Sequence, residues 1–441
     1  MVNDSEPLEF NPFGNSVKCY NQLRNDTHPR KNVQKGIKYS WDSKIQGLIL
    51  SSVYYGFFFT QLPGGILSER IGAKWIYGSG VLISNVLYML LPFSASLGYE
   101  VFIAVRIIEG FAEGLTFPAI NFAISNWSPK SERSRISSII FLGIPFGMII
   151  GMTVSGVLSS TEFLGGWPST FYLFGSCGIL WFIFWSTLVY ETPKDHPYIS
   201  AEELAYIQDG QTESFTVKPV VPWKDIFSSL PVWAVIIAHL GNAYALDGLL
   251  SAIPYVCQIV SSAASSYIAD RLRMSNKISI TSIRKIMNIN RKTSIYTNIL
   301  LYVERDKCFI GPALCLLGIV ASGCQQILIL VLLCSAMFLN GFIYSGYNVT
   351  HVDMSPEFAG VLYGITCTIA NAGGIASPEI SGVITASGDP LQNWNLIFCI
   401  TSAVYFASGV FYAVFASAEK QPWSIVGSDV NAYSILDDEN I

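Results

Sequence analysis

Charged side chains are scarce in this sequence. Asp, Glu, Lys and Arg make up 13% of the 441 residues and hydrophobic residues 51%, whereas a soluble domain carries about 25% charged residues. The mean hydropathy is +0.43. This composition excludes an ordinary soluble domain and predicts an integral membrane protein. Apolar runs of roughly 20 residues recur along the chain, and such runs are typical of membrane helices rather than of the short alternating strands of a barrel.

The sequence also lacks the motifs of most catalytic and metal sites. Its nine cysteines have neither disulfide-framework nor metal-ligand spacing, so we interpret them as small hydrophobic side chains. No nucleotide-binding loop, metal cluster or nucleophile elbow occurs, and Gly373-Gly374 suits a helix bend better than a phosphate cradle. The basic residues gather in a few loops, which argues against nucleic-acid binding. We therefore predict no enzyme activity, no cofactor, no metal and no nucleic-acid partner.

The apolar runs fall into two halves. The first half holds runs at 46–67, 75–93, 99–126, 136–159 and 167–190, and the second at 230–246, 248–268, 309–324, 326–349, 358–386 and 394–417. A polar stretch at 191–229, with four prolines, connects the halves. The predicted fold class is therefore all-α and polytopic, with one helical bundle at 45–190 and a second at 230–417, interrupted by a basic loop at 271–308.

Loop charges predict the orientation of the bundles. Three loops, near 69–74, 130–135 and 271–292, are rich in Lys and Arg, and loops of this kind remain on the cytoplasmic side. The central stretch 191–229 and the polar tail 418–441 are then cytoplasmic as well.

The polar segment 1–44 falls on the outer side in this topology, and it contains no signal peptide. Glycosylation sequons at Asn3 and Asn25 agree with an outer position. Five basic residues from Arg30 to Lys44 oppose it. We give more weight to the three internal loops because they agree with one another, and we expect a helix upstream of Met1 to be missing.

The most informative motif is a set of three ionisable residues in the run 99–126. Arg106, Glu109 and Glu113 recur at spacings of three and four, which places them on one face of a helix. A charge at the centre of a membrane helix costs about 2.5–3.5 kcal/mol on insertion scales, so these charges should face protein or a water-filled path. A structural role would need only one carboxylate, and two carboxylates one turn apart oppose each other's ionisation. We predict that Glu109 pairs with Arg106, that Arg106 shares in anion attraction and that Glu113 takes up a coupling proton.

Other polar residues leave alternatives open. Four polar residues are candidates for contact with a substrate along its path: Tyr54, Asn121, Tyr347 and Asn348. A packing role explains each of them equally well, because polar groups in membrane helices need partners. His351 is expected in a solvated loop at a helix end, with a proton relay beside Asp353 as the alternative, and Glu379 is expected at an outer helix end. A small-residue packing face is predicted from the four-residue spacing of Gly143, Gly147 and Gly151.

Corresponding turns of the two halves carry similar acidic–basic pairs, one after the run 46–67 and one after the run 248–268. This similarity between the halves indicates a duplicated helical unit, and repeats of this kind typically enclose a binding site at the membrane midplane. A conformational latch on the cytoplasmic side is the predicted role of Gly65, Glu69, Arg70, Gly72, Lys74, Asp270 and Arg271.

The first of these loops resembles the signature loop of the major facilitator superfamily. The similarity extends to Thr60-Gln61-Leu62-Pro63-Gly64-Gly65, Glu109-Gly110-Phe111-Ala112-Glu113-Gly114, Trp127-Ser128-Pro129 and Val352-Asp353-Met354-Ser355-Pro356. From about residue 39 to residue 417 the chain resembles the anion transporters that include sialin, the vesicular glutamate transporters and the sodium-phosphate cotransporters. It is most similar to the sialin-like members found in invertebrates.

The resemblance implies a twelve-helix transporter, mostly monomeric, that moves a small anion with H⁺ or Na⁺ by alternating access. In the family, positions matching the charged trio serve transport and proton coupling. Three departures stand out. The first helix, which carries an anion-binding Arg, is absent; the seventh helix is cut short after Asn242; and residues 289–309 are inserted, so about 10–11 of the twelve helices are expected.

Two functional hypotheses follow. The first is a symporter for a small anion (sialic acid or another acidic sugar, phosphate or a glutamate-like molecule) in the plasma membrane or in a lysosomal or vesicular membrane. The second is a non-transporting remnant or regulatory membrane protein of the same family, which the missing helices favour and the charged trio opposes.

Overall fold

The computed structural model describes residues 39–129, 132–208, 221–246, 252–274, 281–282, 310–323, 325–355 and 358–424. The sequons at Asn3 and Asn25 and the insertion at 289–309 lie outside the described residues. Within them, every regular element of three or more residues is a helix, which confirms the all-α class.

The first half of the chain supplies one group of helices. They are α2 (Ser43–Ile71), α3 (Ala73–Leu97), α4 (Tyr99–Glu113), α5 (Thr116–Trp127), α6 (Arg133–Phe141), α7 (Gly143–Ser160) and α8 (Pro168–Leu188). The central stretch holds the short helices α9 (Ala201–Gln208) and α10 (Trp223–Ser228).

The second half supplies the other group, with a 3₁₀ turn, η3 (Gly341–Ser345), between two of its helices. The helices are α11 (Leu230–Leu246), α12 (Ala252–Met274), α14 (Ile310–Ser322), α15 (Gln326–Asn340), α16 (Tyr347–Met354), α17 (Ala359–Ile384) and α18 (Pro390–Phe415).

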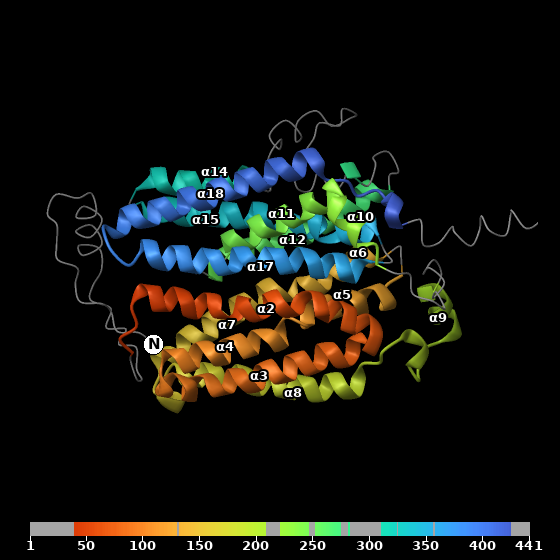
Figure 1. The fold of residues 1–441 in the computed structure, drawn as a ribbon, viewed down its shortest axis with the longest axis horizontal. Coiled ribbons are helices and arrows are strands. Elements are labelled where there is room, and N and C mark those ends of the chain that lie inside the picture. The colour runs from red at the N-terminus through yellow and green to blue at the C-terminus, as the bar shows by residue number, and fades with distance from the viewer. Residues whose placement is uncertain are drawn as a thin grey trace, which may run out of the picture.

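Figure 1 shows these two groups as two bundles whose helices run side by side. Helices α2 and α17 face each other along the seam between the bundles, and α7 also contacts α12 across it. Five of the described helical segments are long and apolar enough to cross a membrane, from α3, α6–α7, α8, α15–η3 and α18. The architecture is that of a polytopic membrane protein.

The predicted runs become helices, but two runs of the first half are interrupted in ways that hydropathy does not reveal. The run 99–126 divides at Gly114–Leu115, and the run 136–159 divides at Leu142. Proline is the third residue of the helix that follows each break, Pro118 in α5 and Pro145 in α7. A proline in the first turn costs no helical hydrogen bond because the amides there have no partner within the helix.

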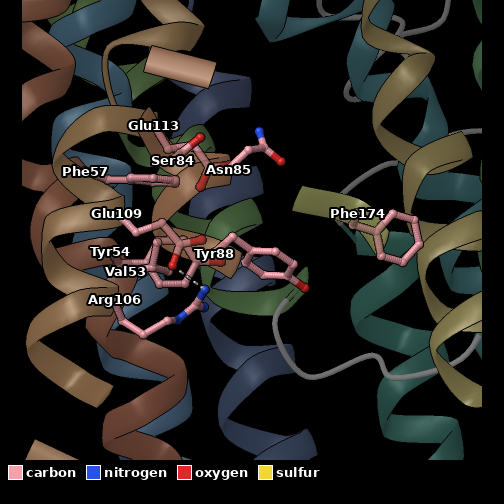
Figure 2. Close-up of a pocket in the computed structure, with 10 residues that line it drawn as sticks. All are labelled: Val53, Tyr54, Phe57, Ser84, Asn85, Tyr88, Arg106, Glu109, Glu113 and Phe174. Carbon is pink, nitrogen blue, oxygen red and sulfur yellow. Dashed lines mark hydrogen bonds and ion pairs between the residues drawn. The ribbon is translucent and has the colours of Figure 1, made fainter. Parts of the chain in front are cut away.

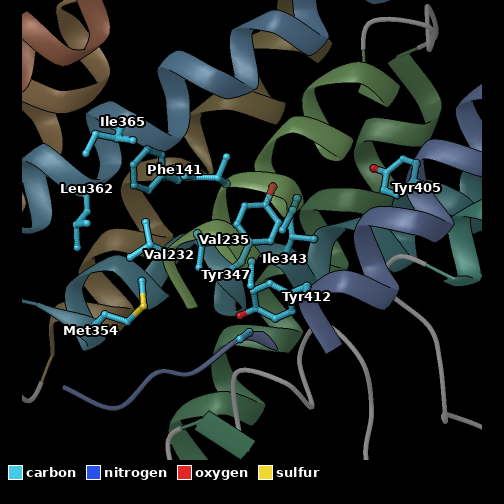
Figure 3. Close-up of a cluster of buried hydrophobic side chains, with 14 of the residues drawn as sticks. Phe141, Val232, Val235, Ile343, Tyr347, Met354, Leu362, Ile365, Tyr405 and Tyr412 are labelled. Atoms are coloured by element: carbon cyan, nitrogen blue, oxygen red, sulfur yellow. The ribbon is translucent and has the colours of Figure 1, made fainter. Parts of the chain in front are cut away.

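The larger buried core among the described residues lies in the second bundle (Figure 3). It includes Val235, Ile343, Tyr347 and Tyr412, each no more than 1% exposed. Ile124 and Phe141 of the first bundle join the same cluster, so the core also ties the bundles together at one end of the seam.

Glycines allow α2 and α4 to approach very closely. A Cβ on Gly56 would overlap the carbonyl oxygen of Ile107, and a Cβ on Gly110 would overlap that of Val53. The two backbones therefore touch where α2 crosses α4, and no larger side chain fits between them.

The glycines of α7 are different. Among the described residues, nothing lies within 4 Å of a Cβ placed on Gly143, Gly147 or Gly151. The predicted packing face therefore has no partner within the part of the chain that the structure describes. A regular glycine spacing shows that close packing is allowed and does not itself supply a neighbour.

We expect opposite results for alanine at these two kinds of glycine. Gly56→Ala forces α2 away from α4 and should cost about 1–3 kcal/mol, as overpacking does. Gly147→Ala, the matched control, meets no described atom and should be neutral or up to about 1 kcal/mol stabilising, because alanine favours a helix over glycine. The apparent melting temperature of each purified variant measures the difference, and equal values for the two variants would contradict the α2–α4 packing.

Candidate functional site

The charged trio lies on one face of α4, as its spacing predicts. Nη1 of Arg106 donates to Oε2 of Glu109 at 3.1 Å, and the two side chains are 20% and 5% exposed. Glu113 continues the same face one turn further, and it lies close enough to the guanidinium to interact with its charge. The predicted Arg106–Glu109 pair is thus present in the structure.

The trio lines a pocket of about 510 Å³ (Figure 2). Pockets for small molecules occupy about 300–1,000 Å³, so this volume suits a small solute. Helices α2, α3, α4 and α8 form its wall, with the side chains of Val53, Tyr54, Phe57, Ser84, Asn85, Tyr88, Arg106, Glu109, Glu113 and Phe174. The three ionisable groups therefore face a cavity inside the first bundle.

Helix α3 contributes polar groups that the sequence reasoning missed. Asn85 Nδ2 donates to the carbonyl of Val81 at 2.8 Å, and Ser84 Oγ donates to the same carbonyl at 3.0 Å. Tyr88 is held by the ring of Phe171, with centroids 4.7 Å apart, and lies near enough to interact with all three charges. An amide next to a hydroxyl inside an apolar run was the available signal for Ser84 and Asn85.

The other predicted substrate-path residues are dispersed. Tyr54 lines the pocket, whereas Asn121 of α5 is half-buried and donates to the Phe117 carbonyl at 2.9 Å. Tyr347 is 1% exposed in the core of the second bundle, against the ring of His239 at 4.4 Å. Asn348 belongs to α16, and its side chain is outside the described set.

His351 corrects one prediction. It is 1% exposed rather than solvated, and its Nε2 lies 2.8 Å from Thr366 Oγ1. The solvated position was expected because His351 ends an apolar run, but α16 packs against α11 and α17, which encloses the imidazole.

The latch residues predicted in the first half lie near the end of α2, which meets α17, and at the start of α3. A Cβ on Gly65 would lie 3.0 Å from the carbonyl oxygen of Gly360 in α17, and one on Gly360 would lie 3.3 Å from Oε1 of Glu69. The first-half latch thus contacts the second bundle through Gly65 and Glu69. Arg70 is exposed. In the second half, Arg271 stacks on Tyr267 of its own helix, and the Asp270 side chain is outside the described set.

A carboxylate that the sequence reasoning missed holds the turn after the latch. Oε1 and Oε2 of Glu191 accept from the amides of Ala73 and Lys74 at 2.6 and 3.0 Å, at the start of α3. Gly72, with φ +113°, makes this turn. The ammonium of Lys74 lies 5.0 Å from the ring of Trp75. Glu191 directly follows an apolar run, so the sequence placed it in the central loop.

The described residues contain no group of three or more His, Cys, Asp or Glu side chains that could hold a metal ion. The chemistry that the pocket offers is one guanidinium, two carboxylates, two phenols, an amide and a hydroxyl. These groups can bind an anion and exchange protons.

The comparisons with known proteins concern most of the chain. A sequence model of the Major Facilitator Superfamily matches residues 24–281. A Drosophila ananassae protein named "Putative inorganic phosphate cotransporter" is 36% identical over 417 residues, covering 89% of this chain and 83% of the relative. Human sialin is 33% identical over 413 residues (89% and 79%), and vesicular glutamate transporter 2.1 of Danio rerio is 33% identical over 418 residues (89% and 68%). These relatives are named as transporters, not as enzymes.

Removing the cation should destabilise the site. Arg106→Gln leaves two nearby carboxylates without a positive partner, and breaking a buried pair in this way costs about 3–5 kcal/mol. The double variant Arg106→Gln/Glu109→Gln should recover most of the loss. Thermal unfolding measures both, with the exposed Lys194→Gln as control. A single variant as stable as the parent would show that the pair contributes nothing.

Proposed function

The chain belongs to the Major Facilitator Superfamily and, within it, to the group that includes sialin, the vesicular glutamate transporters and the phosphate cotransporters, and on this premise we propose that it is a secondary active transporter of a small anion. It is an integral membrane protein, and its partners are the lipid bilayer and the transported solute. The observation that carries the proposal is the pocket lined by Arg106, Glu109 and Glu113.

Charge arithmetic links proton uptake to anion binding. With all three groups ionised the trio carries one positive and two negative charges, a net charge of −1, which repels an anion. One proton brings the net charge to zero and a second brings it to +1. Because opposite charges attract strongly in a low-dielectric cavity, the anion binds best after proton uptake. In this proposal Glu113 takes up the coupling proton and Arg106 attracts the anion.

Movement of the solute requires the pocket to open to each side in turn. The two bundles provide rigid bodies for this, and rocking of one bundle against the other is the usual device in transporters built from repeats. In our proposal, Gly65 and Glu69 hold the end of α2 against α17 when that side is closed, and the cytoplasmic orientation of this end follows from its basic loop.

The substrate class is a small organic or inorganic anion. The names of the relatives suggest phosphate, glutamate or sialic acid as the substrate. We propose H⁺ or Na⁺ as the driving ion. The two carboxylates of the trio favour H⁺. We place the protein in the plasma membrane or in a vesicular or lysosomal membrane, and we propose that the monomer is the transporting unit.

A second candidate function is a non-transporting, regulatory member of the same family. One observation favours it: no described residue lies within 4 Å of a Cβ placed on Gly143, Gly147 or Gly151 of α7. Under this alternative the purified protein moves no anion under any ion gradient.

Uptake into proteoliposomes tests the proposal. With an inward proton gradient, the parent should accumulate at least one of labelled phosphate, glutamate or sialic acid, and Glu113→Gln should abolish the proton-driven part because its amide cannot exchange the proton. Glu100→Gln, an exposed site in the first turn of the same helix, is the matched control and should transport as the parent does. If Glu113→Gln keeps the pH dependence of the parent, Glu113 is not the coupling site.

A further inference from the structure

The seam between α2 and α17 is closed at the end where α2 begins. A Cβ on Gly47 would lie 2.6 Å from the carbonyl oxygen of Pro378, and a Cβ on Gly382 would lie 2.7 Å from that of Ser43. The two backbones are therefore in contact there, although they belong to different bundles. Any opening at this end requires α2 and α17 to separate.

A hydrogen-bonded carboxylate crosses the seam one turn away. Oε1 of Glu379 in α17 accepts from Ser51 Oγ at 2.9 Å and from Tyr55 OH at 2.6 Å, both in α2. Ser51 is 0% exposed. Hydrogen bonds to an ionised carboxylate are shorter and stronger than neutral ones, and an ionisable side chain within a membrane helix is by default functional.

Three polar atoms along the same seam oppose closure. Gln61 Oε1 of α2 and, on α17, Thr368 Oγ1 and Asn371 Nδ2 are buried without a hydrogen-bond partner among the described residues. A Cβ on Gly364 of α17 would lie 3.2 Å from the carbonyl oxygen of Gln61, so this face of α17 meets α2. Thr368 and Asn371 follow Gly364 by four and seven residues and therefore lie on the same face. A buried polar group without a partner costs free energy that water would recover. Closing the seam therefore carries a penalty, which the bonds to Glu379 offset.

We propose that Glu379, with Ser51 and Tyr55, is the clamp that holds α2 against α17 and closes the end of the transport path where α2 begins. The inference rests on the proposed transport by rocking bundles. Breaking the two hydrogen bonds to Glu379 removes their stabilisation of the closed seam. The free-energy cost of the unpaired polar atoms remains, so the seam opens more often. Because the neighbouring Tyr54 lines the pocket and lies against Gly374 of α17, opening at this point exposes the pocket.

Thiol labelling in lipid nanodiscs tests the clamp. Ser51→Cys places a buried thiol in the seam and leaves the Tyr55–Glu379 bond intact, and a membrane-impermeant maleimide reacts with it only when the seam opens. Adding Tyr55→Phe should raise the labelling rate about tenfold, because a hydrogen bond to a charged group is lost. Glu379→Gln should raise it less than Glu379→Leu, since the amide oxygen still accepts. The unmodified parent supplies the background from the native cysteines.

Tyr172→Phe in α8 is the matched control and should leave the rate unchanged. If Tyr55→Phe labels at the rate of this control, the clamp does not exist. A monodisperse gel-filtration peak shows that each variant is folded. If Glu379→Leu fails to fold, Tyr55→Phe still tests the clamp, because it removes only the hydroxyl and keeps the aromatic ring. Faster labelling in a chain that moves no anion would support the clamp and refute transport, whereas uptake with unchanged labelling would refute the clamp alone.

Discussion

The ion pair between Arg106 and Glu109, with Glu113 one turn further on, is the constraint around which the first bundle is built. Charged groups at this depth in a membrane must be kept from lipid. Glycines bring the neighbouring helices close enough to do so. Gly56 lets the backbone of α2 contact that of α4. Gly80 does the same for α3, since a Cβ there would lie 2.7 Å from the carbonyl oxygen of Ala112 in α4. These contacts turn polar and aromatic side chains of α2 and α3 toward the charges, and a pocket remains between them.

Helix α2 links this pocket to the seam between the bundles. One of its faces contacts α4, and another contacts α17 along much of its length. Tyr54 lines the pocket, while Ser51 and Tyr55, three residues before and one after it, bond to Glu379 of α17. A change in how the bundles meet therefore reaches the pocket wall through a single turn of α2. The pocket and the α2–α17 contact at Glu379 are coupled through this turn.

Much of the fold could be predicted from sequence, because hydropathy and spacing are local properties. The apolar runs gave the helices, and the spacing of three and four gave the charged face with its ion pair. The helix breaks before Pro118 and Pro145 were missed, since the residues on either side are equally apolar. Contacts between distant segments left no local trace. Three features depend on which helices become neighbours: the contact of Glu191 with the start of α3, that of Glu379 with α2, and the burial of His351. Neither an apolar run nor the spacing of residues within it predicts which helices will be neighbours.

In the proposed mechanism the charged trio lines a solute path and binds a proton and an anion together. The most direct measurement is the proton exchange of the purified, weakly buffered protein when sialic acid, glutamate or phosphate is added in turn. We expect anion binding to be accompanied by the uptake of about one proton per chain, and this uptake to disappear when Glu113 is replaced by Gln. Anion binding with no change in bound protons, or no binding of any of these anions at any pH, would contradict it.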